Sequence, residues 1–211
     1  MYLIPTPAGT HYAVGSSRDD PQRTLLLSLL HDTSNQQSTL DHLVEISGIA
    51  DRKNVGQMMF KLQRVGWLTN EDEPIMVDQE PIQSALESQL ALLAVGDQAV
   101  LSDETGLRIA HTGFQNEVAD RLSILGAELL ANANPGRINP GRDSEEDDYW
   151  QVSGRWGNIS ATFVRICVGR YRFMLSAGDK PQLDSMAFTR LVALLVRRYS
   201  RGPYPCLPMN H

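Results

Sequence analysis

The segment between residues 98 and 176 most constrains the fold, because it holds short apolar stretches joined by tight turns. Two strands are expected at 98–102 and 107–111, around the turn Asp103-Glu104-Thr105-Gly106, in which glycine supplies a positive φ. Three more strands are expected at 149–152, 159–167 and 170–176. Parallel neighbours would need long crossovers, so this pattern predicts an antiparallel sheet.

Helical patterns separate these strands. Apolar residues recur every three or four positions over 81–95, 115–132 and 183–199. The order helix, two strands, helix, three strands, helix predicts an α+β sandwich with a five-stranded antiparallel sheet. The stretch 131–148 contains two Pro-Gly steps and an acidic run, and we interpret it as a long loop.

The hairpin carries a family resemblance. Residues 100–113, VLSDETGLRIAHTG, combine an apolar strand, an acidic turn with Gly106, a strand containing Ala110, and a closing Gly113. This segment, together with the order of elements over about 120 residues, resembles the Roadblock/LC7 domain. Profilin-like and longin folds are the alternatives with a comparable arrangement.

That resemblance implies a non-enzymatic domain that dimerises through its long middle helix and its third strand. Family members act as platforms or regulators of small Ras-like GTPases, as dynein light chains or as scaffold subunits. It places the dimer interface at Val118, Leu122, Leu125, Tyr149, Trp150 and Val152. In the alternative interpretation, Trp150 and Trp156 are ordinary core residues.

The N-terminal 78 residues form a separate predicted domain. Two short strands are expected at 2–4 and 11–14, around a turn at Pro7-Ala8-Gly9. Three helices follow, with starts at Asp20-Pro21, Ser38 and Asp51, and with Gly48 and Gly66 ending the second and third. The stretch 69–81 is the expected boundary, 79–200 the second domain, and 201–211 an extended tail.

Three short helices followed by a strand hairpin resemble a winged helix, with residues 62–68, LQRVGWL, as the junction to the wing. A DNA-binding role would use the third helix, through Arg52, Lys53, Asn54, Gln57, Lys61 and Arg64. However, residues 1–78 carry 6 basic against 10 acidic residues, and the expected wing at 70–73 is acidic. Acidic groups there would repel a phosphate backbone.

Composition and the absence of known motifs argue against a catalytic or cofactor-binding protein. The chain has a net charge of −6 and 42% hydrophobic residues, with two cysteines and five dispersed histidines. No Walker A, GxGxxG or G-x-S-x-G motif is present. We therefore expect no catalytic residues, cofactor or metal, and with no signal-like or membrane-spanning segment we expect a cytoplasmic protein without membrane insertion.

The sequence thus predicts a homodimeric adaptor that docks protein partners, with a small GTPase as the partner that the resemblance suggests. The alternative is a DNA-binding regulator whose C-terminal domain dimerises or senses a ligand. A ligand-sensing module with a pocket beneath the sheet is a third possibility.

Overall fold

The computed structural model describes residues 1–18, 20–34, 36–75, 81–94, 96–132, 151–156 and 159–200. Its larger sheet has five antiparallel strands in the order β4-β3-β7-β6-β5. They are β3 (Ala99–Asp103), β4 (Arg108–Thr112), β5 (Gln151–Trp156), β6 (Ile159–Val168) and β7 (Tyr171–Ala177). The predicted α+β class and five-stranded sheet are confirmed.

The β3–β4 turn is held by one side chain. Asp103 Oδ1 accepts hydrogen bonds from the backbone N–H groups of Thr105 at 2.9 Å and Leu107 at 3.0 Å. Gly106 has a φ of 85°, which a residue with a side chain rarely adopts. These two residues explain why the hairpin was predictable from the sequence.

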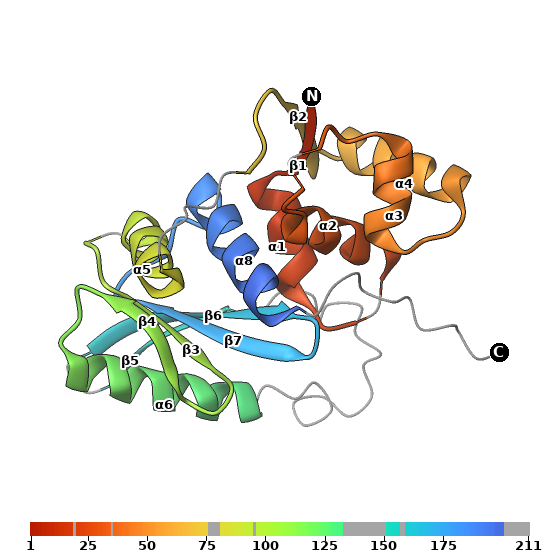
Figure 1. Cartoon of the computed structure of the whole chain (residues 1–211). Helices are drawn as coiled ribbons and strands as arrows, with labels where there is room; N and C mark the ends of the chain where they lie inside the picture. The colour runs from red at the N-terminus through yellow and green to blue at the C-terminus, as the bar shows by residue number, and fades with distance from the viewer. Residues whose placement is uncertain are drawn as a thin grey trace.

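Helices cover both faces of the sheet (Figure 1). One face packs against α6 (Asn116–Asn132), and the other against α5 (Ile82–Leu93) and α8 (Met186–Tyr199). Strand periodicity sorts the side chains between the two layers. Leu101 and Leu175 belong to the core under α5 and α8, whereas Val100 and Met174 belong to the core under α6.

The N-terminal part contains β1 (Tyr2–Pro5), α1 (Pro7–Gly15), α2 (Pro21–His31), α3 (Leu40–Ser47), α4 (Arg52–Arg64) and β2 (Leu68–Glu71). The strand predicted at 11–14 is wrong, because these residues belong to α1. Thr6 caps that helix by accepting a hydrogen bond from Gly9 N at 3.1 Å, and Pro7 takes its first position. The stretch interpreted as a turn is therefore the first helical turn.

The caps of the next helices are local signals. Asp20 and Asp51 cap α2 and α4 as predicted, and Gly48 ends α3 with a φ of 67°. The predicted cap at Ser38 is wrong: Thr39 caps α3, and its hydroxyl accepts from His42 N at 3.2 Å. The Ser38 hydroxyl instead accepts from Leu3 N at 2.9 Å, which ties β1 to this turn.

The strand after α4, β2, pairs with the first strand of the chain, β1. β2 runs antiparallel to β1, with Leu3 opposite Asn70. This pairing brings the beginning and the end of the N-terminal part side by side. The helices α1 to α4 lie between the two strands in the sequence. The expected domain boundary at 78 lies within residues 76–80, which are outside the described residues.

One hydrophobic core connects the N-terminal helices with the sheet. Buried side chains of α1 and α2, such as Ala13 and Leu26, belong to the same cluster as Leu191 of α8 and Val164 of β6. Polar contacts cross the same junction. Thr10 Oγ1 donates to Thr189 Oγ1 at 3.2 Å, and Arg165 Nη2 donates to the carbonyl of Gly15 at 3.2 Å. These contacts therefore hold α1 and α2 against α8 and the sheet.

Candidate interaction surfaces

The helix α6 presents its small and apolar residues to the sheet. Its buried row consists of Ala119, Leu122, Ser123, Gly126 and Leu130. A Cβ at Gly126 would lie 2.9 Å from Met174 Cγ, so glycine allows the helix to approach β7 closely. Leu122, one of the predicted interface residues, is 1% exposed and packs inside the chain's own core.

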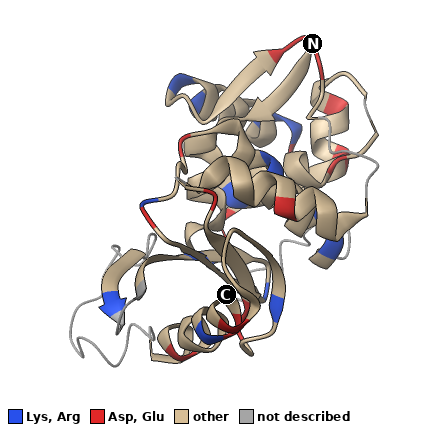
Figure 2. Ribbon diagram, turned by 90° about the vertical axis from the view of Figure 1, so that its left-hand side faces the viewer, with Lys and Arg blue, Asp and Glu red and all other residues tan. Residues whose placement is uncertain are grey.

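A second apolar row lies on one flank of α6. Val118, Leu125 and Leu129 are half-buried and spaced seven and four residues apart. The other flank touches the β3–β4 turn, since a Cβ at Gly106 would lie 3.5 Å from Ala127 Cβ. Successive helical residues turn by roughly 100°. The row Val118–Leu125–Leu129 therefore faces away from that turn, over the β6 and β5 side of the sheet. The outer side of α6 carries acidic and basic residues together (Figure 2): Glu117, Asp120, Arg121 and Glu128.

The strand β5 forms the edge of the sheet on that side. Among the described strands, it pairs with β6 alone. Val152 stands opposite Phe163, whose side chain is in the core under α6, so the half-buried Val152 lies on the α6 face of the sheet. Tyr149 and Trp150, predicted at the same edge, lie outside the described residues.

The outer face of α4 carries the residues predicted to contact DNA or a partner. Arg52, Lys53, Gln57, Lys61 and Arg64 are all exposed. The buried side of the helix consists of Val55, Met58 and Leu62. The structure adds Phe60, which is 65% exposed on the outer face. Phe60 was not among the predicted contact residues, which are all charged or polar.

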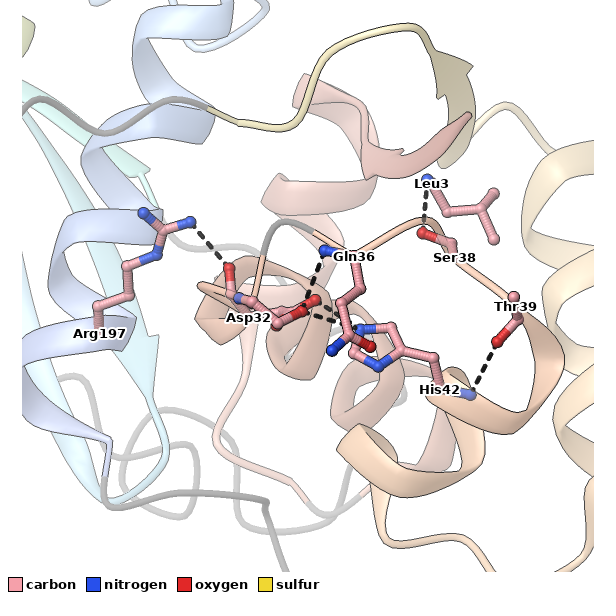
Figure 3. A network of polar contacts seen from close by, with 8 residues as sticks. Leu3, Asp32, Gln36, Ser38, Thr39, His42 and Arg197 are labelled. Carbon is pink, nitrogen blue, oxygen red and sulfur yellow. Dashed lines mark hydrogen bonds and ion pairs between the residues drawn. The ribbon is translucent and has the colours of Figure 1, made fainter.

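A polar network at the end of α2 brings a serine, a histidine and an aspartate together (Figure 3). His42 Nε2 lies 2.7 Å from Asp32 Oδ2 and 3.5 Å from Ser34 Oγ. In a catalytic triad, the serine hydroxyl and the carboxylate contact different nitrogens of the histidine ring. In this network, Ser34 and Asp32 both lie near Nε2 of His42. Burial raises the pKa of Asp32, but hydrogen bonds from His42 and Ser34 outweigh it, and the pKa is lowered. The network therefore favours a structural hydrogen bond between Asp32, at the end of α2, and His42 of α3.

Two solved structures are similar to this chain. A Roadblock/LC7 domain from Streptomyces avermitilis shares 18% identity, with 56% of this chain and 92% of that chain covered at a TM-score of 0.36. Myxococcus xanthus MglB shares 14% identity, with 59% and 93% covered at a TM-score of 0.38. Both TM-scores are below 0.5, so we draw no functional conclusion from these similarities. No protein-family model matches the sequence, and no curated protein matches it either.

A groove of about 830 Å³ lies between the first turn of α1, the α4–β2 turn and the connection from β7 to α8. One wall is aromatic, because Tyr12 and Trp67 stack with their ring centroids 4.0 Å apart. His11 also lines the groove, and burial lowers its pKa. This groove lies between the N-terminal helices and the sandwich, and not beneath the sheet, where the third possibility would place a ligand pocket.

The described part of the chain holds no group of three His, Cys, Asp or Glu side chains that could bind a metal ion. Cys167 is 2% exposed and burial raises the pKa of its thiol, which makes it a poor nucleophile. Within the same residues, no helix has the length and apolar character needed to cross a bilayer.

Proposed function

We propose that this chain is a non-enzymatic, homodimeric adaptor that docks protein partners. One observation carries the proposal: an apolar flank of α6 stands over the sheet beside β5, which pairs with β6 alone among the described strands. An edge strand offers free backbone donors and acceptors to a second strand. Val118, Leu125 and Leu129 supply apolar surface next to that edge.

A second copy fits this surface by two-fold symmetry. In an isologous dimer the same patch meets itself, so β5 would pair antiparallel with its copy while the two α6 flanks pack together. The mixed charges of α6 suit this arrangement, because acidic residues of one copy can face basic residues of the other. Leu122 would support the interface from within by holding α6 on the sheet.

Light scattering coupled to size-exclusion chromatography of the full chain tests the dimer. We expect twice the mass of one chain at micromolar concentration, and a monomer for Leu125→Glu. The matched control is Ile124→Glu, on the adjacent position, whose side chain is 57% exposed and points roughly 100° away from the row. A monomeric wild type, or an equal loss of the dimer in both variants, would contradict the proposed interface.

The small-GTPase partner rests on the family resemblance alone, which the hairpin and the order of elements carry. Its test is co-elution of the dimer with a purified Ras-like GTPase from the same organism, loaded with GDP or with a non-hydrolysable GTP analogue. We expect co-elution that depends on the bound nucleotide. Absence of a complex in both states would remove the GTPase from the proposal and leave the adaptor function standing.

A further inference from the structure

The outer face of α4 forms one continuous row. Lys53, Gln57, Phe60 and Arg64 follow one another at spacings of four, three and four residues, so they lie along one line on the helix. Val55 and Leu62, which are fully buried, mark the opposite side. Phe60 is turned roughly 160° from the middle of that buried side and therefore cannot join the chain's own core.

The charge of α4 has one sign. The helix contains four basic residues and no acidic one, in a chain whose net charge is −6. Arg52 forms an ion pair with Asp41. Lys53, Lys61 and Arg64 make no ion pair with any described residue. These three cations are therefore available to a partner.

Helix stability explains only part of this charge. Lys61 and Arg64 lie in the last turn of α4, where a cation complements the helix dipole. Lys53 lies in the first turn, where the dipole disfavours a cation. Phe60 exposes 65% of its surface without serving the fold. Burial therefore does not explain Phe60, and the helix dipole does not explain Lys53.

We propose that this face of α4 docks a short acidic segment of a partner protein, with an apolar side chain of that segment packed on Phe60. Aromatic residues commonly anchor protein interfaces, and the stems of flanking lysines and arginines extend the apolar contact. Acidic side chains of the partner match the three unpaired cations. The inference rests on the proposed adaptor function for its protein partner, and it does not require the dimer.

The dimensions favour a peptide over DNA. The 13 residues of α4 span roughly 20 Å, the length of a short helix or peptide. The three cations that make no ion pair with a described residue, or six in the proposed dimer, lie at or below the low end of the roughly 6–10 phosphate contacts that a DNA-binding protein can make. Glu71, Asp72 and Glu73 follow α4 closely in the chain and are exposed, so a longer polyanion would meet repulsion there.

The test is selection from a random 12-residue peptide library, displayed on phage, against the immobilised full chain. We expect the enriched peptides to be acidic and to contain at least one large apolar residue. The best peptide is then labelled with fluorescein, and its binding is measured by anisotropy. Enrichment of neutral or basic peptides, or no enrichment, would overturn the inference.

Two variants and one control give the readout. Phe60→Ser, at an exposed position, is expected to weaken binding at least tenfold, and Lys53→Glu/Lys61→Glu should weaken it further and flatten its salt dependence. Arg198→Glu, on the exposed side of α8, should bind like the wild type. Equal peptide binding by Phe60→Ser and by the wild type would show that Phe60 does not anchor the peptide. Tighter binding of a labelled 20-base-pair DNA duplex than of the peptide would overturn the partner class.

Light scattering on the same samples separates this inference from the dimer. A monomeric Leu125→Glu variant that still binds the peptide would show that docking does not depend on dimerisation. A wild-type dimer that selects no acidic peptide would refute the docking face and leave the dimer intact.

Discussion

The guanidinium Nη2 of Arg197 donates to the main-chain carbonyl of Asp32 at 3.0 Å, although 165 residues separate them (Figure 3). Its Nε donates to the carbonyl of Leu30 at 3.2 Å. These carbonyls belong to the C-terminal end of α2, where a helix leaves its last carbonyls without internal partners. Arg197 of α8 therefore caps α2 and joins the N-terminal helices to the sandwich.

Replacement of Arg197 by Met should lower the free energy of unfolding by about 1–3 kcal/mol, because half-buried carbonyls lose their donors while the apolar stem is kept. Urea denaturation followed by circular dichroism measures the loss. Arg198→Met is the matched control, since Arg198 is exposed on the same helix, and its effect should stay within about 0.5 kcal/mol. Equal effects of the two changes would mean that the cap adds no stability.

Gly9 allows α1 to touch the α4–β2 turn. A Cβ at this position would stand 2.1 Å from the carbonyl oxygen of Trp67, which is backbone and cannot turn away. Gly9→Ala should therefore destabilise the chain by about 1–3 kcal/mol through overpacking. In α4, a Cβ at Gly56 would meet only the two Leu40 methyl carbons, at 3.7 and 4.0 Å, so Gly56→Ala should stabilise by about 0.5–1 kcal/mol. Thermal melts of both variants check the contrast in sign.

The features that the sequence predicted correctly are local ones. Asp20, Asp51 and Gly48 end or begin helices through contacts within a few residues, and the Asp103–Gly106 turn is likewise closed by its own residues. The strand predicted at 11–14 failed because four residues give too little pattern to separate a strand from a short helix. Thr6-Pro7 was the overlooked start signal.

Long-range contacts account for the other misses. Ser38 and Thr39 are both residue types that commonly cap helices. The Ser38 hydroxyl instead accepts a hydrogen bond from the backbone N–H of Leu3, which is distant in the sequence. The acceptors of Arg197 are the carbonyls of Leu30 and Asp32, which lie far away in the chain, so no local pattern indicates them. On α6, the resemblance placed Leu122 and Leu125 together at the interface, whereas Leu122 belongs to the core cluster that also contains Met174 and Phe163.

Two half-buried histidines should make stability fall in mild acid. Burial lowers the pKa of His11 below 6.5, and burial together with the charge of Arg197 lowers that of His31 despite the opposing effect of Asp32. The unfolded chain therefore takes up protons near pH 6.5 before the folded chain does. This contribution to stability is complete above pH 6.5 and is lost as the pH falls through the folded pKa values.

We expect the melting temperature to fall between pH 7.5 and pH 5.5. The double variant His11→Gln/His31→Gln should show a smaller fall over the same interval. Melting curves in buffers of matched ionic strength give the comparison. An identical pH dependence in variant and wild type would assign the acid sensitivity to other groups.

Leu122 and Val118 lie four residues apart on α6 and should respond differently to truncation. Leu122 is 1% exposed and fills the core under α6, so Leu122→Ala should cost about 2–5 kcal/mol through lost burial and a residual cavity. Val118 is half-buried on the flank that the proposed dimer covers, so Val118→Ala should cost the fold of a single chain much less. Its main effect should be a rise in the dimer dissociation constant. Urea unfolding at several protein concentrations separates the two effects, because a weaker interface makes the midpoint depend less on concentration, whereas a loss inside one chain lowers the midpoint at every concentration. If Leu122→Ala shifted the dissociation constant more than Val118→Ala at equal folded fraction, the interface would have to include the buried row of α6.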